Sequence, residues 1–322
     1  MTETGTETTH PAINTDPGEG YRRNGYAVVR RIFDADRVAR LLPICERVLA
    51  QWRERPLSDN PPVDSLANYM RHLNNPAYHR GRPEDLAAVL DAAAAPAVLD
   101  AVDQALGEPS VFTSTSMYFN PVGEPLDGFW HKDGIGPEAD DPRDHATGSG
   151  LQVQVALVAS EDLQVVPGSH VRDFTDAERH ICVDDGGANR RSNDMPGAVR
   201  LALQPGDAVL FNQIVIHRGR YHREPPRRTF MISFRKRRVT EATLARRGLD
   251  QYSDQPWFLA PDYLDGTAPE TRRYFSEHTA FYATQWRSKL AEMLKYQHLI
   301  QHLHDTGSPY PFAPREAADF AD

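Results

Sequence analysis

Apolar residues change their spacing along the chain, and the change separates a helical first third from a strand-rich middle. Residues 25–33 form a short apolar run, and residues 34–52 then carry apolar side chains three and four positions apart, as on one face of a helix. Residues 84–106 are rich in Ala and Leu and predict further helix, interrupted near Pro96 because proline removes a helical hydrogen bond. The first third therefore predicts helices around one short strand.

From residue 111 the pattern becomes that of strands. β-Branched and aromatic residues fill 111–120, residues 151–159 begin with apolar and polar positions in alternation, and residues 199–219 place two apolar runs around a Pro-Gly-Asp turn. Residues 227–237 give a last strand. Short strands separated by turns predict a mainly β fold with flanking helices, a β-sandwich or jelly roll.

The two ends of the chain differ from this middle. Residues 1–20 are rich in Thr and Glu and lack the basic, apolar start of a signal peptide, so we expect a disordered leader. From Thr267 onward apolar and aromatic side chains recur at helical spacing. We therefore expect one domain over 21–240 and a helical extension over 241–322, packed on the core or at a dimer contact.

Composition narrows the class of protein. The 322 residues are 40% hydrophobic and 25% charged, which is enough apolar material for a core. No apolar run reaches the roughly 20 residues that span a membrane. Cys45 and Cys182 are the only cysteines, so we expect no disulfide framework and a cytoplasmic protein.

Basic residues gather in residues 189–247, where fourteen Lys and Arg stand against four Asp and Glu, although the whole chain carries a net charge of −9. Such a segment is typical of a solvated face, of a wall around an anionic substrate, or of a nucleic-acid-binding surface. The aromatic side chains among these residues lie at strand spacing, which favours a core position over a base-stacking role. We expect a small-molecule substrate, with no nucleic-acid partner and no membrane.

The candidate chemistry lies in His131, Asp133 and His217. His131 and Asp133 occupy alternate positions at a strand end, so both side chains point to the same face, and a polar loop, residues 134–149, follows them. His217 ends the apolar run AVLFNQIVIH. Two imidazoles and one carboxylate are the ligands that leave three positions open on a non-haem ferrous ion.

An arginine downstream of these residues would bind a carboxylate-bearing co-substrate. Arg228 follows His217 by eleven residues and opens a buried strand, where a guanidinium needs an anionic partner. Arg227 is the competing candidate, because the sequence leaves the faces of this strand open. Tyr118, Asn120 and Gln152 lie on flanking strands and are further candidates for the same site.

In this order the motifs resemble those of the phytanoyl-CoA dioxygenase-like family of iron(II)/2-oxoglutarate oxygenases. The resemblance covers about residues 20–238, and the matching motifs are the opening GYAVVRRIFDADRVARL, the pair His131-x-Asp133, the run VVPGSH and the strand PGDAVLF before His217. It implies a double-stranded β-helix of the cupin-like kind, with Fe(II) held by the catalytic residues His131, Asp133 and His217. It also implies 2-oxoglutarate on the metal, with its far carboxylate paired to Arg228.

The reaction implied by the resemblance consumes O2 and releases succinate and CO2, with ascorbate as reductant in vitro. Asp133 argues against halogenation, because halogenating relatives have a small residue there. We expect hydroxylation or oxidative cyclisation of a small polar metabolite, such as a sugar-, aminosugar- or nucleotide-like intermediate of secondary metabolism or antibiotic biosynthesis. We expect the protein to be a monomer or a homodimer.

Two departures from the family concern the co-substrate site. Many relatives have Ser or Thr where this chain has Gly219, and an Asn-Gly turn where this chain has residues 161–164. For contacts with the primary substrate, we predict the neighbours of the first ligand pair and the carboxylates of the polar loop: Trp130, Lys132, Asp140 and Asp141.

Two other classes of function fit parts of the sequence. A metal-binding jelly roll without oxygenase chemistry, such as a zinc isomerase, lyase or hydrolase, would use the same three ligands. A non-enzymatic protein would use residues 189–247 for nucleic acid, and its binding would depend steeply on salt.

Overall fold

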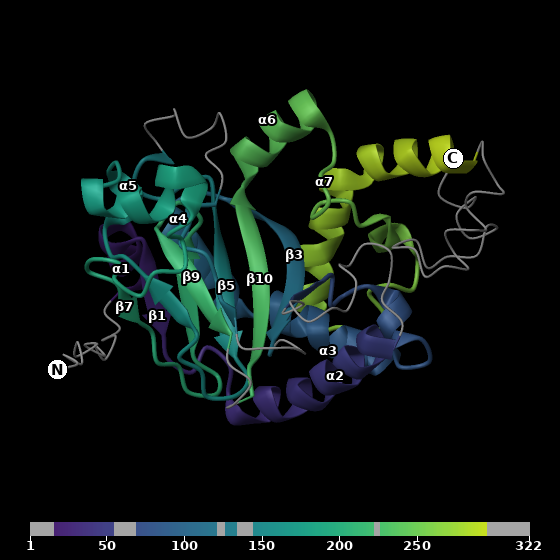
Figure 1. Ribbon diagram of the computed structural model, residues 1–322. Coiled ribbons are helices and arrows are strands. Elements are labelled where there is room, and N and C mark those ends of the chain that lie inside the picture. Colours follow the sequence, from purple (N-terminus) through teal and green to yellow (C-terminus); the bar gives the residue numbers. More distant parts are fainter. Residues whose placement is uncertain (1–15, 55–68, 121–125, 134–143, 222–225, 295–322) are drawn as a thin grey trace.

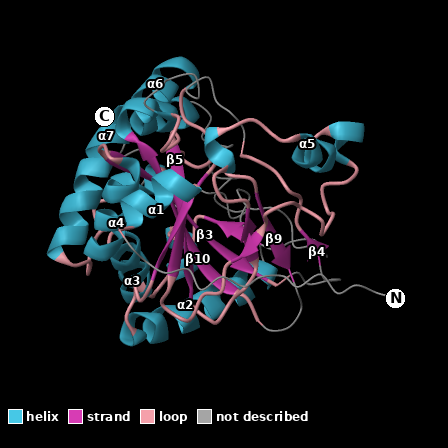
Figure 2. Cartoon of the chain, turned by 90° about the vertical axis from the view of Figure 1, so that its left-hand side faces the viewer, coloured by secondary structure: helices cyan, strands magenta, loops and turns pink. Residues whose placement is uncertain are grey.

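Two antiparallel sheets form the centre of the molecule (Figures 1 and 2). The computed structural model describes residues 16–54, 69–120, 126–133, 144–221 and 226–294. The larger sheet contains, in spatial order, β1 (Tyr26–Val29), β8 (Ala208–Asn212), β5 (Gly150–Ala156), β10 (Arg228–Lys236), β3 (Ser110–Phe119) and β2 (Tyr69–Arg71). The smaller sheet contains β4 (Leu126–Asp127), β9 (His217–Tyr221), β6 (Leu163–Val165) and β7 (Val199–Arg200).

The central strand β10 separates two environments, because successive side chains of a strand point to opposite faces. Phe230, Ile232 and Phe234 join the large hydrophobic core on the helix-covered face. Residues at the alternate positions, such as Met231 and Ser233, therefore face the space between the sheets. Directly paired residues share a face, so Gln152 of β5, which pairs with Ser233, faces this space too.

The smaller sheet packs across this inner face. A second hydrophobic cluster joins Val209 and Phe211 of β8 to Leu163 and Val165 of β6, so the two sheets are packed face to face. Two packed antiparallel sheets with helices outside confirm the predicted double-stranded β-helix, or jelly roll.

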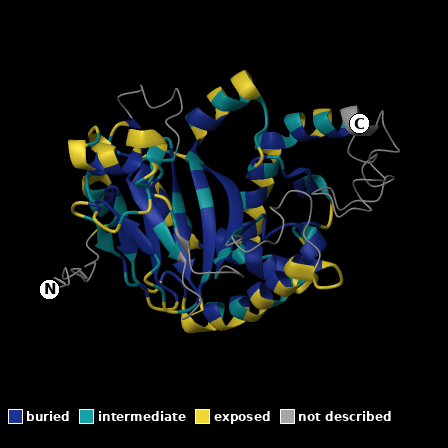
Figure 3. Cartoon of the chain, in the orientation of Figure 1, coloured by how far each residue is buried: buried dark blue, intermediate teal, exposed yellow. Residues whose placement is uncertain are grey.

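Helices cover the outer face of the larger sheet. They are α1 (Pro17–Asn24), α2 (Ala35–Glu54), α3 (Pro83–Ala93) and α4 (Pro96–Leu106). The apolar stripe of α2 is buried in the core, while its opposite side is exposed (Figure 3). The predicted break at Pro96 is confirmed, since α3 ends at Ala93 and α4 begins at Pro96. Helix α1 begins at Pro17, within the expected leader, because the Asp16 side chain accepts a hydrogen bond from the Gly18 N–H and caps it. The other leader residues, 1–15, lie outside the described residues.

Short helices occupy the connections. They are η1 (Pro76–His79), η4 (Ser169–Val171), α5 (Asp176–Cys182) and η5 (Asp184–Gly187). The polar segment near residues 171–195 thus contains a helix, which begins with reciprocal hydrogen bonds between Thr175 and Glu178.

The C-terminal extension packs on the core. It consists of α6 (Arg237–Arg247), η6 (Pro256–Leu259) and α7 (Pro269–Leu294). The aromatic side chains of α7 are buried with Phe258 of η6 and Phe112 of β3: Phe275, Tyr282 and Trp286. The predicted helical stripe of this segment is therefore part of the core as far as Leu290.

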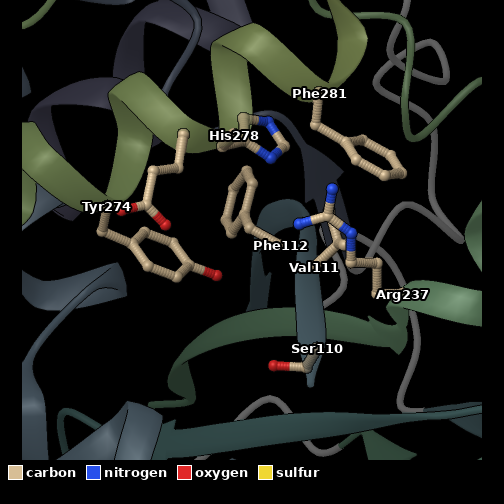
Figure 4. A pocket seen from close by; sticks show the side chains of 8 residues that line it. Ser110, Val111, Phe112, Arg237, Tyr274, His278 and Phe281 are labelled. Carbon is tan, nitrogen blue, oxygen red and sulfur yellow. The ribbon is translucent and has the colours of Figure 1, made fainter.

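A small cavity of about 50 Å³ lies where α7 meets β3 and the start of α6 (Figure 4). Its lining includes Ser110, Arg237, Tyr274 and His278. His278 is buried, and rings of Phe112, Phe258, Phe275, Tyr282 and Trp286 surround it.

Cys45 and Cys182 are both buried and unbonded to each other. In the parts of the chain that the structure describes, no helix is both long and apolar enough to cross a membrane.

Candidate metal centre

The two histidines predicted as ligands face each other across a backbone bridge. The His131 N–H donates to the His217 carbonyl at 3.1 Å, and the His217 N–H donates to the His131 carbonyl at 2.9 Å. Their ring centroids lie 4.3 Å apart. Residues remote in the sequence are thus fixed side by side by main-chain hydrogen bonds, before any side-chain contact is considered.

Asp133 completes the group. Its N–H donates to the Gln213 carbonyl at 2.7 Å, which holds the residue against the turn between β8 and β9. Its Oδ1 lies 3.3 Å from His131 Nε2 and 4.0 Å from His217 Nε2. One nitrogen or oxygen atom from each residue lies within 4.8 Å of the others. Such spacing lets one ion contact all three.

Hydrogen bonds orient both rings for ligation. His131 Nδ1 lies 2.6 Å from the Phe129 carbonyl oxygen, and His217 Nδ1 lies 2.9 Å from the Val215 carbonyl oxygen. A carbonyl oxygen only accepts, so each Nδ1 carries the proton in the neutral ring. The lone pair then lies on Nε2, the atom that faces the other ligands.

Electrostatics favour the metal-binding form of His217 and Asp133 and the protonated form of His131. Burial lowers the pKa of His217 to about 4, so this ring is neutral at neutral pH. Burial alone would raise the pKa of Asp133. The hydrogen bond with His131 and the charges of the two nearby imidazoles have the larger, opposite effect, so this pKa lies below its usual value. Burial lowers the pKa of His131, but the hydrogen bonds to Asp133 and Phe129 raise it above its usual value. A metal ion therefore competes with a proton mainly at His131.

The surroundings of the three residues fit iron. Gln152 Nε2 donates to Asp133 Oδ2 at 3.0 Å, which leaves Oδ1 directed at the histidines. The side chain of His217 is 8% exposed and its ring lies 5.0 Å from that of Phe211, whereas Asp133 is 33% exposed. The group is thus closed on one side and open on the other. Two nitrogens and one carboxylate oxygen with an open side match the facial ligand set of non-haem iron(II).

The structure separates the two candidate arginines. Arg228 points to the helix-covered face, where its guanidinium pairs with Glu46 of α2 at 2.6 Å. Arg227 is 3% exposed, lies 4.9 Å from the Tyr118 ring centroid and is 3.4 Å from Asp162. The chain thus does not bring Arg228 to the inner face, where Gln152 contacts Asp133. The alternation of Phe230, Ile232 and Phe234 with polar residues indicates this, since Arg228 shares their face.

The remaining candidates for the co-substrate site lie on the inner face or at its edge. Tyr118 pairs with Thr229 of β10 and underlies Arg227. Asn120 Oδ1 accepts from the Arg227 N–H at 2.7 Å. Gln152 donates a hydrogen bond to the predicted metal ligand Asp133, a contact that the sequence did not predict because strand position alone does not give side-chain partners.

Of the residues predicted to contact the primary substrate, Trp130 and Lys132 are described, and both are hydrogen-bonded within the protein. Trp130 is 1% exposed, and its indole N–H donates to the Ser192 carbonyl at 2.9 Å, so the strand alternation that turns His131 inward turns Trp130 into a separate hydrophobic cluster. Lys132 donates to the carbonyl oxygens of Ser169 and Arg172 at 2.8 and 3.1 Å. Asp140 and Asp141 lie outside the described residues.

The basic segment, residues 189–247, is largely engaged within the protein. Arg218 is fully buried and bonded to Gln164, and Lys236 is buried against Asp144 at 2.6 Å. Further arginines form ion pairs with carboxylates: Arg227, Arg228, Arg235, Arg237 and Arg238. These contacts do not favour a nucleic-acid surface.

A jelly roll with two histidines and one aspartate at its open side defines a class of mononuclear metal proteins, and the sequence places the chain within it. The sequence profile described as phytanoyl-CoA dioxygenase (PhyH) matches residues 21–230. The chain belongs to this family. A profile of the AraC-like ligand binding domain also matches residues 198–272, less than half of the chain. No curated protein matches the sequence.

Solved structures share the fold. AviO1 from Streptomyces viridochromogenes Tue57 has 19% sequence identity and a TM-score of 0.52, with 71% of this chain and 97% of that chain covered. SnoK, described as a non-haem alpha-ketoglutarate-dependent carbocyclase from nogalamycin biosynthesis, has 20% identity and a TM-score of 0.50, with 72% and 87% covered. At such identities the likeness concerns the fold alone.

Proposed function

We propose that this protein is an Fe(II)/2-oxoglutarate-dependent dioxygenase that hydroxylates or oxidatively cyclises a small polar metabolite and releases succinate and CO2. The observation that carries the proposal is the convergence of His131, Asp133 and His217, with both Nδ1 atoms bonded to carbonyl oxygens and both Nε2 atoms directed at one point. Membership of the phytanoyl-CoA dioxygenase family supports it.

Each residue of the site has a distinct role in the proposal. His131 and His217 bind the ion through Nε2, and Asp133 binds it through Oδ1. Iron in this ligand set would activate O2 for oxidation of a C–H bond in the substrate. Gln152 holds Oδ2 of Asp133 and fixes the carboxylate, as partners of metal ligands commonly do. Phe211 packs against His217 and excludes water from the buried side.

Arg227 is our proposed anchor for the far carboxylate of 2-oxoglutarate, in place of Arg228. It is buried and lies on the inner face of β10, and Thr229 Oγ1 accepts a hydrogen bond from its Nε at 3.3 Å. A buried guanidinium in a site of low dielectric binds carboxylates strongly. Gly219 provides no hydroxyl, so we expect Arg227 and its neighbours Tyr118 and Asn120 to replace that contact.

The substrate class follows the sequence-based expectation. We propose a sugar-, aminosugar- or nucleotide-like intermediate of secondary metabolism, processed in the cytoplasm by a monomer or homodimer. The partly exposed side of the metal centre supports access for a small molecule.

The test is succinate release from 2-oxoglutarate by the purified protein with Fe(II), O2 and ascorbate. Asp133→Ala should abolish release and iron binding, because it removes the one anionic ligand. His180→Ala is the matched control, since His180 is exposed on α5 and pairs only with Asp184 at 3.8 Å among its described ion pairs. Release that persists in Asp133→Ala, or that needs no iron, would contradict the proposal.

The same ligands also suit zinc, and the assay separates the two metals. A zinc hydrolase, lyase or isomerase would retain its metal but form no succinate from 2-oxoglutarate. Iron content measured beside succinate release therefore decides between an oxygenase and a hydrolytic jelly roll.

A further inference from the structure

The turn that follows α6, residues 248–255, lies beyond the family match and returns to the open side of the barrel. Asp250 organises it, because its Oδ1 accepts from the N–H groups of Tyr252 and Ser253, both at 2.9 Å. The Asp250 carboxylate also pairs with Arg235 at 3.0 Å. Arg235 alternates with Ser233 along β10 and so shares its inner face. The extension is thereby tied to the same wall that carries Gln152.

The edge strand β2 of the same sheet holds this turn as well. Arg71 of β2 donates to the side-chain oxygen of Gln251, and its guanidinium lies 5.8 Å from the Tyr252 ring centroid. His72 Nε2 lies 2.9 Å from the Gln251 carbonyl oxygen. His72 has a φ of 55°, a region that residues with side chains rarely adopt. Tyr252 is therefore held between the central strand β10 and the edge strand β2.

Tyr252 lies against the larger sheet, because its neighbours Asp250 and Gln251 are bonded to Arg235 of β10 and Arg71 of β2. Burial raises the pKa of its phenol, so the phenol is a neutral hydroxyl at neutral pH. Tyr69 of β2 pairs with Tyr118 of β3 and stacks on its ring at 5.5 Å, so this second aromatic ring lies on the same inner face of the sheet.

Two serine hydroxyls face the same space. Ser114 pairs with Ser233 and Ser116 pairs with Met231, which places both on the inner face of β3. Both residues are fully buried, and neither hydroxyl has a hydrogen-bond partner among the described residues. A buried hydroxyl without a partner is unfavourable, so these atoms indicate a bound polar group. Ser114 and Gln152 both pair with Ser233, and Gln152 contacts Asp133, whereas Arg227 directly precedes the other end of β10.

We propose that the turn 248–255 forms one wall of the primary-substrate site, and that Tyr252 selects a substrate with a hydroxyl-bearing ring. The hydroxyls of Tyr252, Ser114 and Ser116 are uncharged groups that both donate and accept, as ring hydroxyls do. The aromatic faces of Tyr69 and Tyr252 suit the C–H faces of such a ring. This inference rests on the proposed function and specifies its substrate.

The experiment measures how added compounds stimulate succinate release. The probes are myo-inositol, methyl glucoside and adenosine, with cyclohexane carboxylate and cyclohexylamine as ring compounds without hydroxyls. We expect at least one hydroxylated probe to stimulate release in the wild type, and Tyr252→Phe to raise its KM about tenfold. Ser114→Ala should raise the same KM. Tyr274→Phe removes a hydroxyl from α7 in the same extension and is the matched control.

Dissociation constants for 2-oxoglutarate, measured on the same proteins, distinguish failure of the substrate inference from failure of the proposed function. Tight 2-oxoglutarate binding without stimulation by any hydroxylated probe overturns this inference and leaves the proposed function standing. Stimulation only by the compounds without hydroxyls, or equal KM values in Tyr252→Phe and Tyr274→Phe, overturns it too. Absence of 2-oxoglutarate binding would remove the proposed function itself.

Discussion

Two buried histidines, His217 and His278, share an environment but differ in their partners. Burial lowers the pKa of His217 to about 4 and that of His278 to about 3, so both are neutral. His217 has Nδ1 bonded to a carbonyl oxygen and Nε2 directed at Asp133. His278 lies among aromatic rings, and neither of its nitrogens has a partner among the described residues. Neighbours, rather than burial or pKa, therefore distinguish a metal ligand from a packed side chain.

The largest expected difference between the two histidines concerns the metal. His217→Ala should remove iron binding and lower 2-oxoglutarate turnover by more than about 100-fold, since loss of even an outer partner of a ligand costs about 10- to 100-fold. His278→Phe should leave both unchanged, because its cage lies on the far side of β3. Metal content and succinate release on the two variants measure this. Equal losses would show that His278 supports the site and would break the comparison.

Arginines give the next largest contrast. Arg227→Ala should weaken 2-oxoglutarate binding by about 1.5–3 kcal/mol, the usual value of a charged hydrogen bond. Arg228→Ala should change that affinity little, since its partner is the half-exposed Glu46. Titration of 2-oxoglutarate into the iron-loaded proteins measures both. If Arg228→Ala weakened 2-oxoglutarate binding more than Arg227→Ala does, Arg228 would be the residue that binds the far carboxylate, as the family spacing implies.

The third contrast concerns stability and pH. Unfolded histidine has a pKa of about 6.5, above the folded value of His278, so only the unfolded chain takes up this proton between about pH 6.5 and 3. The contribution of neutral His278 to stability is therefore complete above pH 6.5 and falls with pH, by up to about 1.4 kcal/mol per unit. His278→Phe should reduce this slope and raise stability by about 1 kcal/mol at acidic pH. Denaturant unfolding across this range would show it, and an unchanged slope would mean that the ring is solvated in the folded state.

The smallest expected effect tests how Asp162 changes carboxylate binding by Arg227. Asp162 lies 3.4 Å from its guanidinium and competes with any carboxylate that binds there. Asp162→Asn should therefore tighten 2-oxoglutarate binding a few-fold, with Glu161→Gln as the adjacent control. A weaker affinity would show that Asp162 orients Arg227 instead of competing for it.

Much of this architecture follows from local sequence patterns. Alternation along residues 227–237 and the turn at residues 204–207 predict the central strands, and the His131-x-Asp133 spacing predicts a shared face. Arg228 alternates with Phe230 and Ile232, but the sequence does not show which face of this strand the helices cover, so it leaves Arg227 and Arg228 as alternatives. Family spacing alone led instead to Arg228 as the anchor.

Other features depend on contacts between distant segments. The hydrogen bond from Gln152 to Asp133, the ion pair of Arg227 with Asp162 and the return of Tyr252 over the sheet join residues far apart in the chain. Trp130 illustrates the same limit. It directly precedes His131, and the alternation of side chains therefore places it in a hydrophobic cluster and not beside the predicted metal ligands. Sequence patterns give the face of a side chain but not its partner.

The backbone bridge between His131 and His217 has a consequence for how the protein matures. The first ligand pair emerges from the ribosome well before β9 does, and alone it offers only two of the three ligands. If these three residues hold the metal as proposed, its tight binding would follow closure of the small sheet. An ion that binds only the closed state also stabilises that state by mass action. Bound iron would then stabilise the closed barrel. Its removal by a chelator should lower the melting temperature of the protein as well as its activity.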